Sequence, residues 1–259
     1  MHRRVCWQAA HVVSFVLLLV PASRVEAQRA TQAHAHPRLS LTLAGGWASF
    51  AHSPVNRSIR LDNYLLTAPV DSGGVGLSKG LDEIADGLGL SAEVRWRMGE
   101  GWGLSVGLQR LYDRSRVSFT YDPGTGPESG YMEYVVEGLP LHAGVYREWP
   151  FTERLTYRLG GALLYFPSSR LRVSGRIGGL AALQETGTAD GIGAMFNWGG
   201  SFRLNESLSL EAGVRLRLGR IGDPVDDDGD VIQTTTGMEL APMDWSGVDI
   251  VLGITYGFF

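Results

Sequence analysis

Charged side chains recur at every second position in several segments of this chain. Glu93, Arg95 and Arg97 have this spacing, and Arg215 and Arg217 repeat it further along. Residues two apart share one face of a β-strand, so each run collects its charges on one side, where facing runs form charge-assisted hydrogen bonds. We therefore expect a buried charge network in which Glu93 and Glu211 are the central acceptors. Its expected members are Glu93, Arg95, Arg97, Arg158, Arg203, Glu211, Arg215, Arg217 and Asp249.

This network has two interpretations. In the first it is the polar core of a narrow barrel, where every charge must be paired because breaking a buried pair costs about 3 to 5 kcal/mol. In the second it gates a narrow pore. The sequence leaves both open, and planar-bilayer recordings distinguish them.

A nucleophile beside a general base would indicate an enzyme. His52 and Ser53 are adjacent, and Asp82 and Glu83 follow in the same long connection. Neighbouring residues point to opposite faces of a strand, and no acid is brought to the pair by its spacing. We expect no enzymatic activity, with a lipid-modifying esterase as the alternative.

Three further motifs are similar to ligand sites. His34 and His36 have metal-ligand spacing but belong to the expected N-terminal tail. Asp226–Asp230 is acidic like a calcium loop, yet Val231 holds the sixth position, where such loops need glycine. Gly73–Lys79 lacks the Gly-Lys-Ser/Thr ending of a phosphate loop and is expected to be a linker. We expect no metal and no cofactor, with weak calcium binding by the acidic loop as the alternative.

Apolar side chains also alternate, and they do so in eight segments. The clearest segment runs from Leu88 to Met98, reverses at 99–101 and returns from Trp102 to Leu108. This is the pattern of an antiparallel hairpin. The other expected strands lie near 39–50, 139–145, 155–163, 192–202, 208–218 and 248–258.

The connections between these strands alternate in length. Those near Gly99, Pro150 and Asn205 are short. The long ones, rich in Gly, Asp and Ser, span about 51–87, 113–131, 167–189 and 222–242. Short periplasmic turns with long extracellular loops are typical of transmembrane barrels. The prediction is an all-β protein: an eight-stranded antiparallel up-and-down transmembrane β-barrel.

The first 27 residues have the order of a secretory signal peptide. Two arginines precede the apolar run Val12–Val20, and small residues follow up to Ala27. We expect cleavage after Ala27, a flexible tail over 28–37 and a barrel domain over 38–259. Cleavage removes the single cysteine, three arginines and one glutamate, so the net charge changes from −4 to −6. Nothing in this acidic composition favours nucleic acid as a partner.

Alternation alone does not say which face points inward. A soluble lipocalin-like carrier with leucines inside is an alternative, and Gly45–Trp47 is similar to the lipocalin Gly-x-Trp, though at the wrong end of its strand. Aromatic residues favour the membrane barrel, because they gather where two interfacial girdles would lie. The girdle expected at the short turns is Trp96, Trp102, Trp149, Phe151, Phe202 and Phe258; the one at the long loops is Trp47, Tyr112, Tyr165 and Trp245. Arg110 and Arg147, on the outer face, lie near strand ends and can reach head groups.

The alternation continues beyond the membrane. Through Val117 and Phe119, and back through Tyr134 and Val136, it predicts strands of about twice the 9 to 11 residues that a crossing needs. We expect an extracellular β-ribbon whose free edges an extracellular protein can join. Residues 81–85 are expected to form one helical turn.

The last strand, Val248–Phe258, leads into a terminal Phe259, and this aromatic ending resembles the final strand of bacterial outer-membrane β-barrels. The chain after the signal resembles the small eight-stranded barrels of the outer membrane protein A, X and W type. The resemblance implies the outer membrane of a Gram-negative bacterium, both termini in the periplasm and a monomer. It implies outer-membrane lipid, lipopolysaccharide and the barrel-assembly machinery as partners, the last through the C-terminal strand.

The expected function is a structural or surface-interaction role with a filled, charged lumen. An eight-stranded barrel is too narrow for an open water channel, because its side chains fill it. A narrow passive channel for small or apolar solutes is the main alternative.

Overall fold

A computed structural model describes residues 38–68, 76–77, 79–122, 126–177, 183–231 and 243–258. The expected signal peptide and tail, with His34 and His36, lie outside these residues. The strands are β1 (Leu39–Ser49), β2 (Asp86–Gly99), β3 (Trp102–Tyr121), β4 (Glu128–Gly138), β5 (Leu141–Pro150), β6 (Leu155–Ile177), β7 (Leu183–Arg203), β8 (Leu208–Ile221) and β9 (Gly247–Phe258). The helix α3 (Ser53–Thr67) follows β1. Among the described residues, no helix combines the length and apolar character that crossing a membrane requires.

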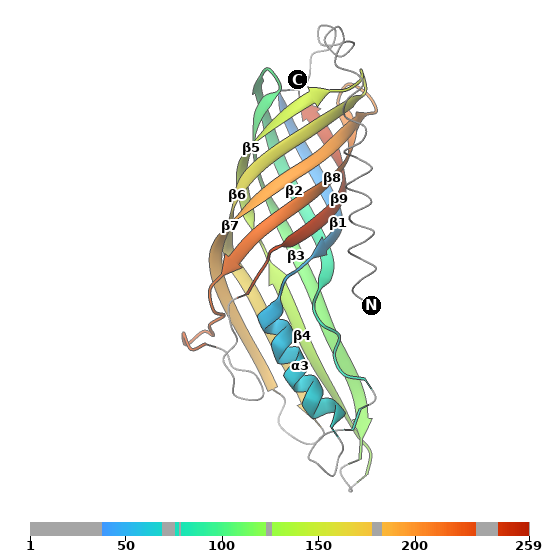
Figure 1. Cartoon of the computed structure of the whole chain (residues 1–259), viewed down its shortest axis with the longest axis vertical. Helices are drawn as coiled ribbons and strands as arrows, with labels where there is room; N and C mark the ends of the chain where they lie inside the picture. The colour runs from blue at the N-terminus through green and yellow to red at the C-terminus, as the bar shows by residue number, and fades with distance from the viewer. Residues whose placement is uncertain are drawn as a thin grey trace.

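The strands close into one antiparallel ring. The first strand, β1, pairs with β2 on one side and with the last strand, β9, on the other. The strands β4 and β5 lie end to end and fill one position in the ring, because each of them pairs with β3 on one side and with β6 on the other. The ring therefore has eight strands, and the predicted barrel is confirmed (Figure 1).

Two prolines divide the wall into a barrel section and an extension. The strand β4 ends at Gly138 and β5 begins at Leu141, because Pro140 between them has no amide hydrogen for the ladder. Nearby, the register of β6 against β7 shifts at Pro167, between Phe166 and Ser169. We call the end of the barrel that carries the short turns the short-turn end, and the opposite end the helix end.

In the barrel section the outward faces are apolar. Leu163 and Ile192 are 75% and 74% exposed, and in water such exposure would forfeit most of the free energy that burying these side chains provides. An apolar outer surface around a closed ring is the arrangement that a bilayer stabilises. The apolar belt consists of Leu39, Leu43, Leu88, Leu90, Val94, Leu104, Val106, Leu108, Leu141, Val145, Leu159, Leu163, Ile192, Phe196, Leu210, Leu216, Leu218, Ile250, Leu252 and Ile254.

The turn between β2 and β3 shows how tightly the short-turn end is closed. Glu100 and Gly101 have φ angles of 50° and 80°. Positive φ at both central residues is the requirement of a type I′ turn, whose twist matches that of the strands it joins.

Beyond the two prolines, β3, β4, β6 and β7 continue as a four-stranded sheet, the extension (Figure 1). Most of the link predicted over 167–189 is therefore strand. Here most of the buried inward side chains are apolar, and arginine and glutamate side chains lie on the outward face. The barrel section has the opposite arrangement, with apolar side chains outward and charged ones inward. The buried inner face consists of Leu111, Phe119, Met132, Tyr134, Val136, Leu171 and Val173.

The helix α3 covers that inner face. Its buried residues Val55, Ile59 and Leu66 recur at helical spacing, while Arg57 and Tyr64 face out. The exposed two-stranded ribbon predicted from the sequence is therefore wrong: the hairpin belongs to a wider sheet with a helix packed against it. The outward face of this sheet nevertheless stays uncovered by the helix.

Two asparagines on α3 hold the segment after it. Asn56 donates to the Ile84 carbonyl at 2.7 Å and accepts from the Ile84 amide at 2.7 Å. Asn63 makes the same pair of bonds with Leu81, at 2.8 and 2.6 Å. The helical turn predicted over 81–85 is wrong, because these amide groups satisfy the backbone in place of a helix.

We expect Asn56→Ala to loosen this segment. The change leaves the buried amide and the buried carbonyl of Ile84 without their side-chain partner, which lowers the free energy of unfolding by about 2 kcal/mol. Hydrogen exchange at Ile84 and along α3 should accelerate while exchange in β8 and β9 stays unchanged. Asn63→Ala is the graded control, since its bonds are only partly buried and its effect should be smaller. Equal protection in Asn56→Ala and the unmodified protein would contradict this account.

Candidate functional site

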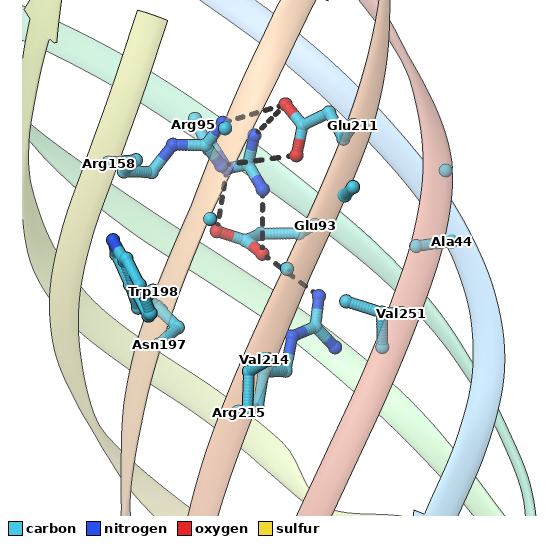
Figure 2. A pocket seen from close by; sticks show the side chains of 15 residues that line it. Ala44, Glu93, Arg95, Arg158, Asn197, Trp198, Glu211, Val214, Arg215 and Val251 are labelled. Carbon is cyan, nitrogen blue, oxygen red and sulfur yellow. Dashed lines mark hydrogen bonds and ion pairs between the residues drawn. The ribbon is translucent and has the colours of Figure 1, made fainter. Parts of the chain in front are cut away.

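The lumen near the short-turn end holds a network centred on the Glu211 carboxylate (Figure 2). Glu211 accepts from Arg95 Nη1 at 2.5 Å and from Arg158 Nη2 at 2.8 Å. The hydroxyl of Thr255 donates to the same carboxylate at 2.6 Å. These donors come from β2, β6 and β9, so the carboxylate ties together strands on different sides of the ring.

Glu93 is the second acceptor. Arg95 Nε donates to it at 2.8 Å, and Arg215 Nη2 lies 3.7 Å away. Arg215 also donates to Ser91 Oγ at 3.0 Å. His142 Nε2 lies 3.8 Å from Glu93 on the far side. All of these side chains are buried, so the charges are compensated by one another rather than by water.

Glu148 belongs to this network although the sequence did not single it out. It bridges Arg97 and Arg158, the latter at 3.1 Å. It lies directly opposite Arg158 in the pairing of β5 with β6. Its place two residues after Tyr146 put it on the inward face of β5, and that spacing was the signal that could have found it.

Arg217 and Asp249 form a separate pair nearer the helix end. Arg217 Nη2 donates to Asp249 Oδ1 at 2.8 Å, and both side chains are almost wholly buried. Arg217 also donates to the carbonyls of Trp245 and Ser49, each at 2.9 Å. Gln109 donates to Asp249 at 2.9 Å. The structure thus divides the predicted set into two clusters, and Arg203 lines the cavity at the short-turn end together with Arg97 and Glu211.

An aromatic layer, which we call the plug, closes the lumen above Arg217. The Trp245 ring lies edge-on to Phe50 and His52, with centroids 5.4 and 4.6 Å apart, and stacks on Phe166 at 6.3 Å. Phe50 also lies 5.5 Å from the Arg217 guanidinium. Trp245 is wholly buried, so its predicted place in the outer girdle is wrong.

Above the plug, α3 closes the helix end. The Tyr134 hydroxyl on β4 donates to the buried Asp62 carboxylate on α3. Burial and the Asp62 charge both raise the pKa of Tyr134, which keeps the hydroxyl protonated as the donor. This bond joins the helix to the extension.

The open volume inside the barrel is small. One cavity of about 30 Å³ lies among Glu93, Arg95, Arg158, Glu211 and Arg215. A second, of about 60 Å³, opens at the short-turn end beside Tyr146 and Arg203. Volumes of this size hold a few water molecules.

The other candidate motifs are not assembled into sites within the described part of the chain. His52 is buried with neither ring nitrogen hydrogen-bonded, while Asp82 pairs with Lys79 and Glu83 with Arg60. Asp226 accepts the amides of Asp228 and Asp230, at 3.0 and 2.9 Å, and so stabilises its own loop. No group of three or more metal-ligating side chains occurs among the described residues.

The outer aromatics and arginines lie at the edges of the belt. Trp96, Trp102, Trp149, Phe202 and Phe258 are all exposed near the short-turn end, and Trp47 and Tyr165 near the other. Arg147 lies over the rings of Trp102 and Trp149, at 5.4 and 5.3 Å. Phe258 is on the outward face of β9, and Phe259 lies outside the described residues.

His52 makes the plug sensitive to acid. Burial, and secondly the Arg217 charge, lower its pKa from 6.5 to about 3. The unfolded chain therefore binds a proton that the folded chain excludes, and stability falls as the pH drops below 6.5. Between pH 7 and pH 5 we expect a loss of about 2 kcal/mol in the free energy of unfolding.

Urea unfolding in lipid vesicles at the two pH values measures this loss. His52→Phe is the control, because a ring without a titrating group still stacks on Phe50 and meets Trp245 edge-on. The free energy of unfolding of the His52→Phe variant should not show the loss between pH 7 and pH 5 that His52 causes in the unmodified protein. Identical pH profiles for the two proteins would refute the assignment.

No family model and no curated protein matches this chain. Solved structures similar to it include neisserial surface protein A, with 14% identity over 85% of this chain and 97% of that one and a TM-score of 0.43. Others are the attachment invasion locus protein Ail of Yersinia pestis (12% identity, 86% and 100% covered, TM-score 0.39) and OprG of Pseudomonas aeruginosa (13%, 86% and 98%, TM-score 0.37).

Proposed function

We propose that the protein is an integral outer-membrane barrel that conducts no solute and presents its extension at the cell surface as a contact element. The observation that carries the proposal is the closure of the lumen by successive layers: the Glu211 network, the Arg217–Asp249 pair, the plug and α3. The ion-pair layers join β2, β6, β8 and β9, and the plug and α3 lie above them. A solute path would therefore have to break several buried ion pairs and displace the plug as well.

The extension supports the surface role. It continues the wall past the apolar belt with a charged outward face, and a helix covers its inner face. A barrel needed only to anchor itself in lipid requires no such structure, because strands of about 9 to 11 residues already cross the membrane. β6 has 23 residues.

Two measurements test the proposal. The purified barrel in planar bilayers should show no discrete conductance. Conductance steps whose number scales with the amount of protein would instead support the narrow-channel alternative. In intact cells, a membrane-impermeant maleimide should label Arg57→Cys on α3 and leave Glu100→Cys in the β2–β3 turn unlabelled until the cells are lysed. The opposite labelling would overturn the proposed orientation.

The contact role is tested on the same cells. Coupling a bulky polymer to the new thiol of the Arg57→Cys variant should suppress attachment and cell–cell aggregation relative to unlabelled cells. Cells carrying Glu100→Cys, treated identically, are the matched control. Loss of attachment in both, or in neither, would argue against contact through the extension.

A further inference from the structure

The outward face of the extension contains an arginine groove. Its volume is about 300 Å³, and it runs across β3, β4 and β6. Its lining residues are Arg110, Tyr112, Arg114, Glu133, Val135, Glu137, Arg170 and Arg172. Four guanidinium groups and two carboxylates leave this groove with a net charge of +2. The chain as a whole is acidic, so a positive groove is an exception that needs an explanation.

Both carboxylates in the groove form ion pairs with arginines of β3. Glu137 pairs with Arg110 at 2.8 Å, and Glu133 pairs with Arg114. On the other side, β4 offers Glu137 opposite Arg170 but Val135 opposite Arg172. Within the residues that the structure describes, neither Arg170 nor Arg172 forms an ion pair, and both are exposed. Two guanidinium groups therefore face outward with their donors available.

The groove begins where the apolar belt ends. Arg110 follows the exposed Leu108 by two positions, a rise of about 7 Å along the strand. On β6, Arg170 lies just past the Pro167 bulge, above the exposed Tyr165. With the belt in the acyl region, the arginines lie at the height of the head groups, where anionic oxygens are concentrated.

We propose that the arginine groove binds the phosphorylated sugar head group of an outer-leaflet glycolipid. The guanidinium groups of Arg170 and Arg172 match phosphate oxygens with paired hydrogen bonds, which a lysine ammonium does not. Tyr112 lies between Arg110 and Arg114 on β3, and Val135 lies on β4 opposite Arg172. Together they provide a surface against which a sugar ring packs. The volume exceeds that of a lone phosphate and accommodates a sugar together with its phosphate. The inference rests on the outer-membrane location proposed above.

The test uses the purified barrel in nanodiscs, so that it does not depend on conductance or cell contact. The probe is a glycolipid whose sugars carry phosphate monoesters, compared with the same glycolipid after phosphatase treatment and with phosphatidylglycerol. Retention of the glycolipid is measured by native mass spectrometry after transfer to detergent. Arg170→Gln/Arg172→Gln removes both available guanidinium groups, and Arg170→Lys/Arg172→Lys keeps the charge without the paired geometry.

We expect the Gln double variant to bind the phosphorylated glycolipid at least about tenfold more weakly, with the Lys variant in between. Arg57→Gln, which removes an exposed arginine from α3, is the control for net charge and should bind normally. Phosphatase treatment should abolish retention. Equal binding of phosphatidylglycerol, or full binding of the glycolipid by a correctly folded Gln variant, would overturn the proposal. Neither result would bear on the proposed function as a closed barrel.

Discussion

Replacing Glu211 with alanine is expected to lower the free energy of unfolding by about 3 to 5 kcal/mol. The substitution leaves Arg95 and Arg158 buried side by side without the carboxylate that separates their charges. It also removes the acceptor of the Thr255 hydroxyl. Urea unfolding in lipid vesicles, followed by tryptophan fluorescence, measures the change.

Glu206→Ala is the matched control for Glu211→Ala. Glu206 lies exposed in the turn that follows β7, and its loss should change stability by less than about 0.5 kcal/mol. Removing a guanidinium together with the acid, in Glu211→Ala/Arg158→Met, should recover part of the loss, because an apolar side chain replaces an uncompensated charge. If the double variant were less stable than Glu211→Ala, charge compensation would not be what this cluster provides.

Replacing Trp245 with alanine is expected to cost about 3 to 5 kcal/mol as well, through a cavity rather than a charge. The ring packs against Phe50, His52 and Phe166, so its removal leaves three aromatic groups without their common neighbour. The Arg217–Asp249 pair lies below the plug and should remain. We therefore expect α3 and the extension to become sensitive to protease while the barrel section stays folded in lipid.

Limited chymotrypsin digestion of the reconstituted barrel checks the effect of Trp245→Ala, with cleavage sites assigned by mass spectrometry. Tyr64→Ala removes an aromatic ring that is 75% exposed on α3 and should leave the digestion pattern of the remaining sites unchanged. Cuts distributed evenly over the short turns and α3 would indicate global unfolding and contradict a local role for the plug. Resistance equal to that of the unmodified protein would contradict it too.

The apolar pattern of β3 also indicates where the barrel section gives way to the extension. In β3 the outward apolar residues occupy even positions up to Leu108, whereas the next apolar residues, Leu111, Val117 and Phe119, occupy odd ones. With no break in the strand, this change of parity means that the apolar side moves from the outer to the inner face. It indicates an extension with its own core, and not the exposed ribbon that length alone suggested.

The sequence indicates the helix α3 less clearly than the strands. Pro54 at its first turn and the spacing of Val55, Ile59 and Leu66 are helix signals. Asp62 interrupts the apolar stripe, because a buried carboxylate at that position requires a hydrogen-bond donor. That donor is Tyr134, 72 positions along the chain.

The sequence by itself determined the strands, their two faces and the closure of the chain into a barrel, because each follows from the side-chain period of two and from turn lengths. Tertiary structure alone decided which charges meet, which arginines Glu148 pairs with and that Trp245 turns inward. Those contacts depend on register between strands and on ring closure, which bring Arg95 to Glu211 across 116 positions. A local pattern places a side chain on a face, but only the closed ring determines what lies opposite it.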